Sequence, residues 1–141
     1  MFGQPKKESY VIFSPLDGLL MQNGKPLANT KIIRRLRWNG NDEGLVEEFE
    51  TDSEGRFSLP VHEEELSLGM LSQFVGKAKL YVDTEKADNL FWYSPKLTPE
   101  IYSETDGPLN NLVCDISFPE TVVNLSTWNI LTKCQWQDMP K

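Results

Sequence analysis

The sequence predicts an all-β fold, an antiparallel β-sandwich that carries one short helix. Turn signals separate short apolar or alternating runs, a pattern typical of antiparallel strands, and helical periodicity is scarce. With 141 residues, of which 39% are hydrophobic and 25% charged, the chain has the size and composition of one globular domain. We expect this domain to span residues 10–141, behind a flexible N-terminus of residues 1–9.

The first strand signals lie near the N-terminus. Residues 10–13 (YVIF) and 18–22 (GLLMQ) predict strands that Pro15 interrupts. The dipeptide Asn23-Gly24 follows them and tolerates the positive φ angles of a tight turn. A hairpin or sheet edge is therefore expected at this point.

Residues 30–38 (TKIIRRLRW) predict a strand whose two faces differ. The inner face is expected to hold Ile32, Arg34, Leu36 and Trp38, and the outer face Lys31, Ile33, Arg35 and Arg37. A buried, unpartnered guanidinium is very costly, so Arg34 should lie at the sheet margin or meet a carboxylate. Glu47 and Glu48, in a returning strand over residues 45–51, can stand across from the arginines.

Further short strands follow, separated by turns and by a long loop over residues 95–110. They are predicted at residues 56–59, 77–83, 90–93 and 111–117, and more weakly at 122–125 and 130–131. The expected core residues are Ile32, Leu36, Trp38, Phe57, Leu59, Leu80, Val82, Val113 and Cys114 or Ile116. Trp128 and Trp136 are expected to anchor the C-terminal tail.

Residues 63–74 (EEELSLGMLSQF) form the one helix candidate. Leu66, Met70 and Phe74 recur at a spacing of four residues, and the glutamates at the start suit the positive end of a helix dipole. Gly69 weakens the segment by about 1 kcal/mol relative to alanine, so the predicted helix is short.

The two cysteines, Cys114 and Cys134, are too far apart for a metal knuckle and too few for a disulfide scaffold. We expect both to be buried in a reducing compartment, with a cross-strand disulfide as the alternative after export. Residues 1–9 carry two lysines but no apolar stretch of the length that a signal peptide or membrane span needs. The expected location is the cytoplasm.

The sequence offers no catalytic constellation. His62 is the single histidine, it follows a proline that ends a strand, and no serine or cysteine lies in a nucleophile motif. A glycosidase needs two carboxylic acids on either side of the bond that it cleaves, and spacing in the sequence does not show such a pair. Neither a cluster of metal ligands nor a glycine-rich phosphate loop is present. We therefore predict a protein that is not an enzyme and uses no cofactor or metal.

Charge and aromatic residues indicate the kind of partner instead. The net charge of −7 argues against nucleic acid, which needs clustered lysine and arginine. Glu47, Glu48, Glu50 and the run Glu63, Glu64, Glu65 are candidates for steering a basic protein partner. Trp92 lies between Phe91 and Tyr93, so strict alternation would expose either Trp92 or its two neighbours, and Trp92 is the candidate aromatic anchor if its face is open. The alternative is that a second layer, either the helix or the C-terminal tail, covers this face.

Two segments resemble the carboxypeptidase regulatory-like, or transthyretin-like, β-sandwich superfamily. The first match is Gly24, Lys25, Pro26, Leu27 and Ala28; the second is Thr51, Asp52, Gly55, Phe57, Leu59 and Pro60. Pro26 sets the entry to the long strand, and Gly55 supplies a turn conformation. The resemblance covers about the first 60 residues, whereas residues 63–74 and the tail after Pro119 depart from the minimal seven-stranded pattern, so no binding site is transferred.

The resemblance implies a transthyretin-like sandwich with a binding or spacer role, similar to small stand-alone bacterial proteins of this fold. Because such modules also connect effectors to the delivery spike in contact-dependent and type VI secretion systems, it suggests a bacterial immunity protein or an effector adaptor. A structural or assembly subunit is the first alternative. A transthyretin-like hydroxyisourate hydrolase is the second, but that activity needs histidines and a C-terminal motif that this sequence lacks.

Overall fold

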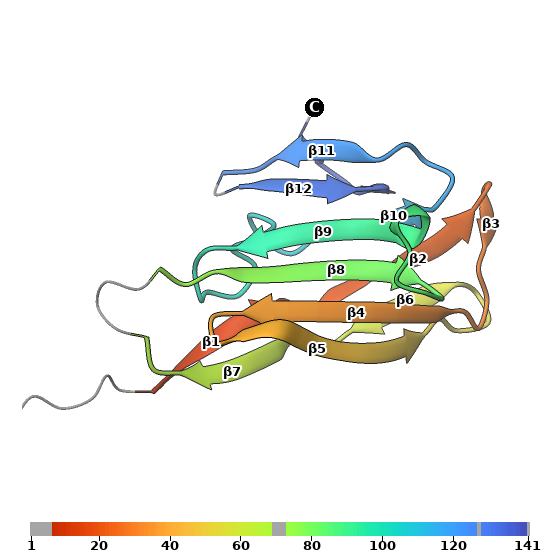
Figure 1. Ribbon diagram of the computed structural model, residues 1–141. Helices are drawn as coiled ribbons and strands as arrows, with labels where there is room; N and C mark the ends of the chain where they lie inside the picture. The colour runs from red at the N-terminus through yellow and green to blue at the C-terminus, as the bar shows by residue number, and fades with distance from the viewer. Residues whose placement is uncertain (1–6, 69–72, 127, 141) are drawn as a thin grey trace, which may run out of the picture.

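The computed structural model describes residues 7–68, 73–126 and 128–140, and these form two β-sheets packed face to face with a two-stranded ribbon at one end (Figure 1). The predicted all-β sandwich is confirmed. Within the described residues the helical structure is one 3₁₀ turn, η1 (Ala87–Asn89).

The larger sheet, here the front sheet, has six antiparallel strands. Their order is β11 (Thr121–Asn124), β12 (Asn129–Thr132), β9 (Leu90–Lys96), β8 (Gly76–Val82), β4 (Lys31–Trp38) and β5 (Asn41–Glu50). In Figure 1 they run from the top of the view to the bottom. β11 and β5 are therefore the two edges of this sheet.

The back sheet and the ribbon complete the fold. The back sheet has the order β13 (Cys134–Gln135), β10 (Val113–Asp115), β2 (Leu16–Gln22) and β3 (Lys25–Pro26), with β6 (Arg56–Leu59) also paired to β2. The β10–β2 pair is parallel, and the other pairs are antiparallel. The ribbon consists of β1 (Glu8–Phe13) and β7 (His62–Leu66).

The core lies between the sheets and matches the predicted inner face of β4, although Ile33 on the outer face is also buried, at 8% exposed. Ile32 and Leu36 on β4 are fully buried, whereas Lys31 on the other face is exposed. Phe57, Leu59, Leu80, Val82 and Cys114 are buried as expected, while Trp38, Val113 and Ile116 are half-buried. Strand β1 begins at Glu8, two residues earlier than predicted, and β5 begins at Asn41, four residues before the predicted start at residue 45.

The turns form where glycine and asparagine predict them. Asn23 and Gly24 have φ angles of 53° and 78° and close the β2–β3 hairpin. The buried Asp115 carboxylate accepts hydrogen bonds from the Asn23 and Gly24 amides at 3.1 and 2.8 Å. Desolvation raises the pKa of Asp115. Its hydrogen bonds with Ser117, Gly24 and Asn23 together lower the pKa by more, so the pKa lies below its usual value.

The predicted helix over residues 63–74 is wrong for the described residues 63–68 and 73–74, while residues 69–72 lie outside the described residues. Residues 62–66 form strand β7, which pairs with β1 so that Glu64 lies opposite Tyr10. Burial along β7 alternates with a period of two residues, and the buried Phe74 packs on Tyr10 with ring centroids 5.0 Å apart. Met70 lies outside the described residues. The backbone of β7 forms its hydrogen bonds with β1, and the spacing of apolar residues in the sequence does not show that this partner strand is available.

Strand β9 departs from strict alternation because it contains a bulge. Trp92 pairs with Leu80 and Leu90 pairs with Tyr81, which leaves Phe91 as the extra residue. Phe91 and Trp92 are each 1% exposed and both belong to the core. The prediction that alternation exposes either Trp92 or its neighbours is therefore wrong. Trp92 also contacts Trp136, which confirms Trp136 as an anchor of the tail, while Trp128 is 57% exposed, contrary to the prediction.

Arg34 is the charged residue at the centre of the core, and it meets a carboxylate as predicted. Its side chain is 1% exposed, and its Nη2 lies 2.8 Å from Glu47 Oε1 on β5. Its Nη1 donates to the Pro60 carbonyl at 2.6 Å. The guanidinium carbon lies 4.9 Å from the ring centroid of Phe13 and 4.8 Å from that of Phe49. These contacts compensate the buried charge and connect β4 to β1, β5 and the β6–β7 link.

The two cysteines are buried as predicted, and they form the cross-strand disulfide that the sequence left as an alternative. Cys114 on β10 lies directly opposite Cys134 on β13. β13 follows β12 after Lys133 alone, so the bond secures the point where the chain passes from the front sheet to the back sheet. Because the return of β13 to β10 is a tertiary event, the spacing of the cysteines could not predict it.

Breaking the Arg34–Glu47 pair from one side should destabilise the fold strongly. Glu47→Ala leaves the buried guanidinium without its carboxylate and is expected to lower the free energy of unfolding by about 3–5 kcal/mol in urea titrations. The double variant Arg34→Met/Glu47→Leu should lose far less, because apolar side chains replace both charges. Glu48→Ala is the control: its pair with Lys31 is exposed and should contribute about 1 kcal/mol or less. Equal losses for Glu47→Ala and Glu48→Ala would contradict this.

Removal of the disulfide should lower stability because the unfolded chain gains conformational entropy without the cross-link. The bond closes a loop with a sequence separation of 20 residues, so Cys114→Ala/Cys134→Ala is expected to lower the free energy of unfolding by about 3 kcal/mol. A reductant should lower the stability of the wild type in the same assay and leave the double variant unchanged. Insensitivity of the wild type to reductant would show that the bond contributes nothing to stability.

Candidate binding surface

The outer face of the front sheet, the side turned away from the back sheet, carries one residue row that crosses all six strands. Cross-strand pairing aligns Val122, Leu131, Tyr93, Lys79, Arg35 and Val46 in this order from β11 to β5. The two end residues are exposed, Val122 by 56% and Val46 by 43%, and the four between them are half-buried. The row therefore has a cationic centre and apolar ends.

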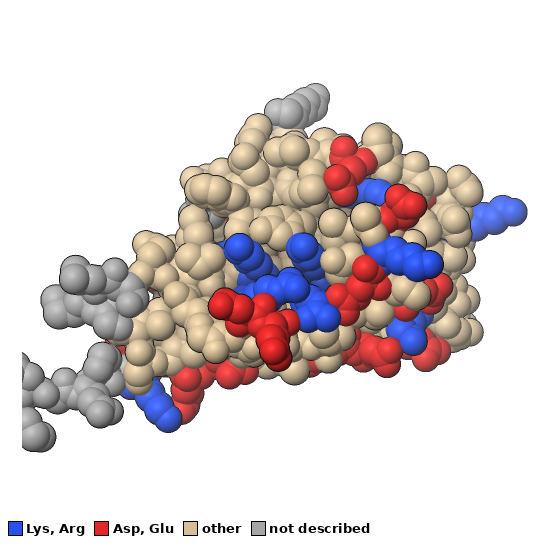
Figure 2. Space-filling view, in the orientation of Figure 1, with Lys and Arg blue, Asp and Glu red and all other residues tan. Residues whose placement is uncertain are grey.

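Four basic side chains form the centre of this face, and we call them the basic quartet: Arg35, Arg37, Lys77 and Lys79. Arg35 lies directly opposite Lys79, and Arg37 directly opposite Lys77, on the adjacent strands β4 and β8. Figure 2 shows the blue side chains gathered at the middle of the face. Like charges directly opposite one another destabilise a sheet. A chain of net charge −7 thus keeps two such pairs side by side.

Glu85 neutralises one member of the quartet, Arg35, through direct hydrogen bonds, and its charge also attracts Arg37 and Lys79. Arg35 Nε and Nη2 donate to the two carboxylate oxygens of Glu85 at 2.6 and 3.0 Å. This hydrogen bonding raises the pKa of Arg35 and holds the pKa of Glu85 below its usual value of 4.5, against desolvation in both cases. The Lys79 ammonium lies 5.6 Å from the ring centroid of Tyr93. Among the described residues, no ion pair joins Arg37, Lys77 or Lys79 to a carboxylate.

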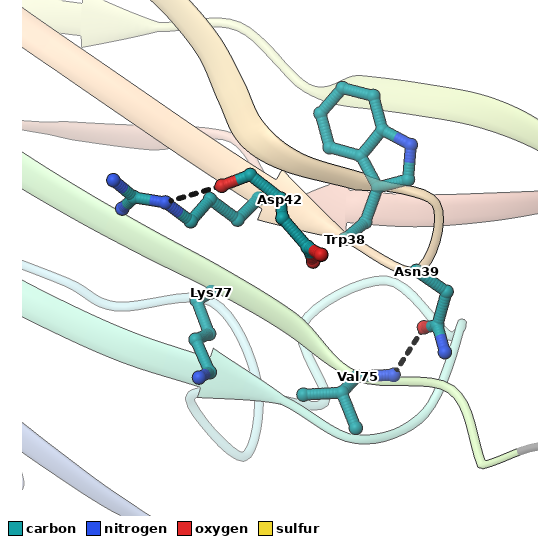
Figure 3. A pocket seen from close by; sticks show the side chains of 6 residues that line it. Trp38, Asn39, Asp42, Val75 and Lys77 are labelled. Atoms are coloured by element: carbon teal, nitrogen blue, oxygen red, sulfur yellow. Dashed lines mark hydrogen bonds between the residues drawn. The ribbon is translucent and has the colours of Figure 1, made fainter.

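A hollow of about 180 Å³ adjoins the quartet at the end of β4. It is lined by Arg37, Trp38, Asn39, Asp42, Val75 and Lys77. Figure 3 shows Lys77 on one side, Trp38 and Asn39 on the other, and Asp42 between them. Arg37 Nε donates to the Asp42 carbonyl at 3.0 Å, and Asn39 Oδ1 accepts from the Val75 amide at 2.7 Å. These bonds hold the rim while the Lys77 ammonium stays exposed.

The acidic candidates on β5 are largely engaged within the sheet. Glu47 binds the buried Arg34, and its side chain is only 30% exposed. Glu48 lies 3.1 Å from Lys31, and Glu50 is the register partner of that same lysine. Glu47 therefore stabilises the core, while Glu48 and Glu50 shield an edge strand. That these acids steer a basic partner stays a prediction, and Glu47 has a structural role in the core as well.

The other candidates lie on the ribbon or in the core. Glu63 and Glu65 occupy the exposed face of β7, and Glu63 accepts a hydrogen bond from Ser9 at 3.3 Å. Glu64 is half-buried, and its Oε2 lies 2.6 Å from Nε2 of His62. Trp92 is buried and donates its Nε1–H to Ser94 Oγ at 2.9 Å. Trp136 of the C-terminal tail packs on it, as the alternative interpretation of the sequence expected, so Trp92 is not an exposed anchor.

The sequence did not predict a buried polar network around Lys96. The Lys96 ammonium donates to the carbonyls of Thr98 and Glu100 and to Ser103 Oγ, and it lies 3.8 Å from Glu104. Burial lowers the pKa of Lys96, and the charges of Glu104 and Glu100 oppose this. Because these carbonyl and carboxylate oxygens only accept hydrogen bonds, the network binds the ammonium form. It ties the loop after β9 into the fold rather than preparing a neutral lysine base.

The described residues are 7–68, 73–126 and 128–140. In these segments no group of three or more histidine, cysteine or acidic side chains is placed to hold a metal ion. No helix there is long and apolar enough to cross a membrane.

One known protein family covers most of this surface. A family model matches residues 16–119 and is described as "Domain of unknown function (DUF6795)". The chain belongs to this family. The matched segment contains the quartet and the hollow and ends just before β11. Searches of the curated proteins and of the solved structures found no match. The resemblance to transthyretin-like modules stays a prediction from the sequence.

Relieving the like-charge contacts of the quartet should stabilise the protein. Lys77→Glu turns the repulsion with Arg37 into an attraction and is expected to raise the free energy of unfolding by roughly 0.2–1 kcal/mol, less at high salt. Lys31→Glu is the control, because Lys31 faces Glu48 and Glu50 and its reversal should destabilise. Both variants change the net charge equally. If urea titrations move both in the same direction, the quartet carries no local strain.

Proposed function

We propose that the protein is a non-catalytic protein-binding module that receives an acidic partner on the outer face of its front sheet. The observation that supports this is the basic quartet. Two like-charge pairs stand side by side in a chain with 21 acidic and 14 basic residues. Stability alone favours removing such contacts, so their presence fits a surface that a partner's carboxylates neutralise.

The surroundings of the quartet favour a protein over a nucleic acid. Tyr93 and Leu131 continue the row on one side, and the exposed Val122 and Val46 end it, so apolar contacts flank the charges. Protein interfaces combine aromatic and arginine anchors with apolar contacts in this way. A net charge of −7 opposes a long polyanion, whose binding grows with the number of phosphates neutralised.

The proposal keeps the binding role expected from the sequence and reverses the sign of the partner. Glu47 and Glu48 are paired with Arg34 and Lys31, which weakens the case for a basic partner on β5. An immunity protein and an effector adaptor are both binding modules of this kind. The resemblance to transthyretin-like modules supports that class without naming the partner.

The test compares two variants that change the net charge equally. Arg37→Glu/Lys77→Glu alters the quartet, whereas Lys25→Glu/Arg56→Glu alters exposed cations on the back sheet. Binding to acidic proteins captured from the native cells should weaken roughly tenfold for the quartet variant, mainly through slower association, and stay near wild type for the control. Association rates should be measured at several salt concentrations. Equal binding by both variants would remove the quartet from the interface.

A further inference from the structure

Strand β11 is an edge of the front sheet, with pairing on one side only. It pairs with β12, and the Leu125 amide donates to the Trp128 carbonyl at 3.0 Å in the turn of this hairpin. Hydrogen-bonded and non-hydrogen-bonded pairs alternate along an antiparallel ladder. Counting back from Leu125, Val122 and Asn124 direct their backbone N–H and C=O groups away from β12, toward the open side.

This edge lacks the protection that the opposite edge has. No charged residue occurs from Thr121 to Thr132 (TVVNLSTWNILT). On β5, the other edge, the acids are Asp42, Glu43, Glu47, Glu48 and Glu50. Charged side chains prevent an edge strand from pairing with another chain, and an uncharged edge invites it. The front sheet thus has charged side chains on its β5 edge and none on its β11 edge, which we call the bare edge.

Exposed apolar side chains mark the same hairpin. Val122 and Trp128 are 56% and 57% exposed, the largest exposures among the large hydrophobic residues of the described chain. On the inner face of the hairpin, Val123 and Ile130 are 2% and 1% exposed. The hairpin therefore has an ordered, buried side that fixes its position and an open side with both backbone groups and apolar surface to offer.

We infer that β11 pairs antiparallel with β11 of a second copy of this chain, in the register that places Val122 opposite Val122. In this register the side chains of the outer face lie beside side chains of the outer face, so Val123 stays on the core side in both copies. The outward groups of Val122 then form a reciprocal pair of hydrogen bonds. Each Glu120 lies opposite the partner's Asn124, so the two carboxylates do not face each other.

A second copy fits this edge for two reasons. A strand whose central residue pairs with itself is self-complementary, as a twofold interface requires. Two molecules of charge −7 repel each other, and pairing through β5 would bring two rows of carboxylates together, whereas β11 brings none. The uncharged edge is thus where two copies of an acidic chain can meet at least electrostatic cost.

The dimer would also extend the proposed function. The twofold axis of such a pair is perpendicular to the sheet, so both outer faces turn to the same side. Two basic quartets would then lie on one continuous surface, and a partner that engages both would gain affinity by avidity. This consequence depends on the proposed function, but the dimer itself does not, and its test uses the oligomeric state alone.

Sedimentation equilibrium on the full chain tests the edge directly. The wild type should show a concentration-dependent dimer, and Val122→Lys should raise its dissociation constant at least about tenfold by placing two like charges opposite each other. Val46→Lys is the matched control, because Val46 ends the same row on β5, and it should leave the dimer unchanged. A monomeric wild type, or equal effects of the two lysines, would overturn the inference.

Backbone pairing is separated from simple apolar contact by two further variants. Val122→Pro removes an outward N–H without removing a hydrogen bond to β12, so the fold should survive while the dimer is lost. Val122→Thr keeps the backbone group and the branched side chain and should keep the dimer. Circular dichroism confirms that each variant is folded. A folded Val122→Pro variant that still dimerises like the wild type would show that the strands do not pair.

Discussion

The arrangement of the sheets depends on one buried ion pair. Arg34 lies in the core between Phe13 and Phe49, and its guanidinium binds Glu47 and the Pro60 carbonyl. A charge in this position is tolerated only while every contact is made. It therefore holds the ribbon strand β1, the edge strand β5 and the chain before β7 in one relative position. Loss of Glu47 would leave a buried, uncompensated charge.

The same strand supplies the proposed binding surface. Because side chains alternate along β4, the residues on either side of the buried Arg34 face outward, and Arg35 and Arg37 join Lys77 and Lys79 there. The acids on β5 are used for the core and for protection of the edge. Net charge consequently does not describe this face: the acidic chain presents four basic residues together at its centre, with acidic side chains beside them (Figure 2).

The C-terminal strands connect the bare edge to the core. β12 continues into β13, and the Cys114–Cys134 bond holds β13 against the back sheet. Trp136 packs on Trp92 just beyond this bond. The β11–β12 hairpin is thus fixed at its base by covalent and aromatic contacts, while Val122 on β11 stays exposed. A rigid edge loses little conformational entropy on pairing, which favours association.

The sequence by itself determined the features that depend on local periodicity. The all-β class, the inner and outer faces of residues 30–38, the Asn23-Gly24 turn and the need of Arg34 for a carboxylate all follow from alternation and turn chemistry. Tertiary structure decided the rest. Residues 62–66 became a strand because β1 offered a partner, and Phe91 became a bulge because β8 set the register. The disulfide, the basic quartet and the bare edge arise from pairings between residues distant in sequence, which no local pattern records.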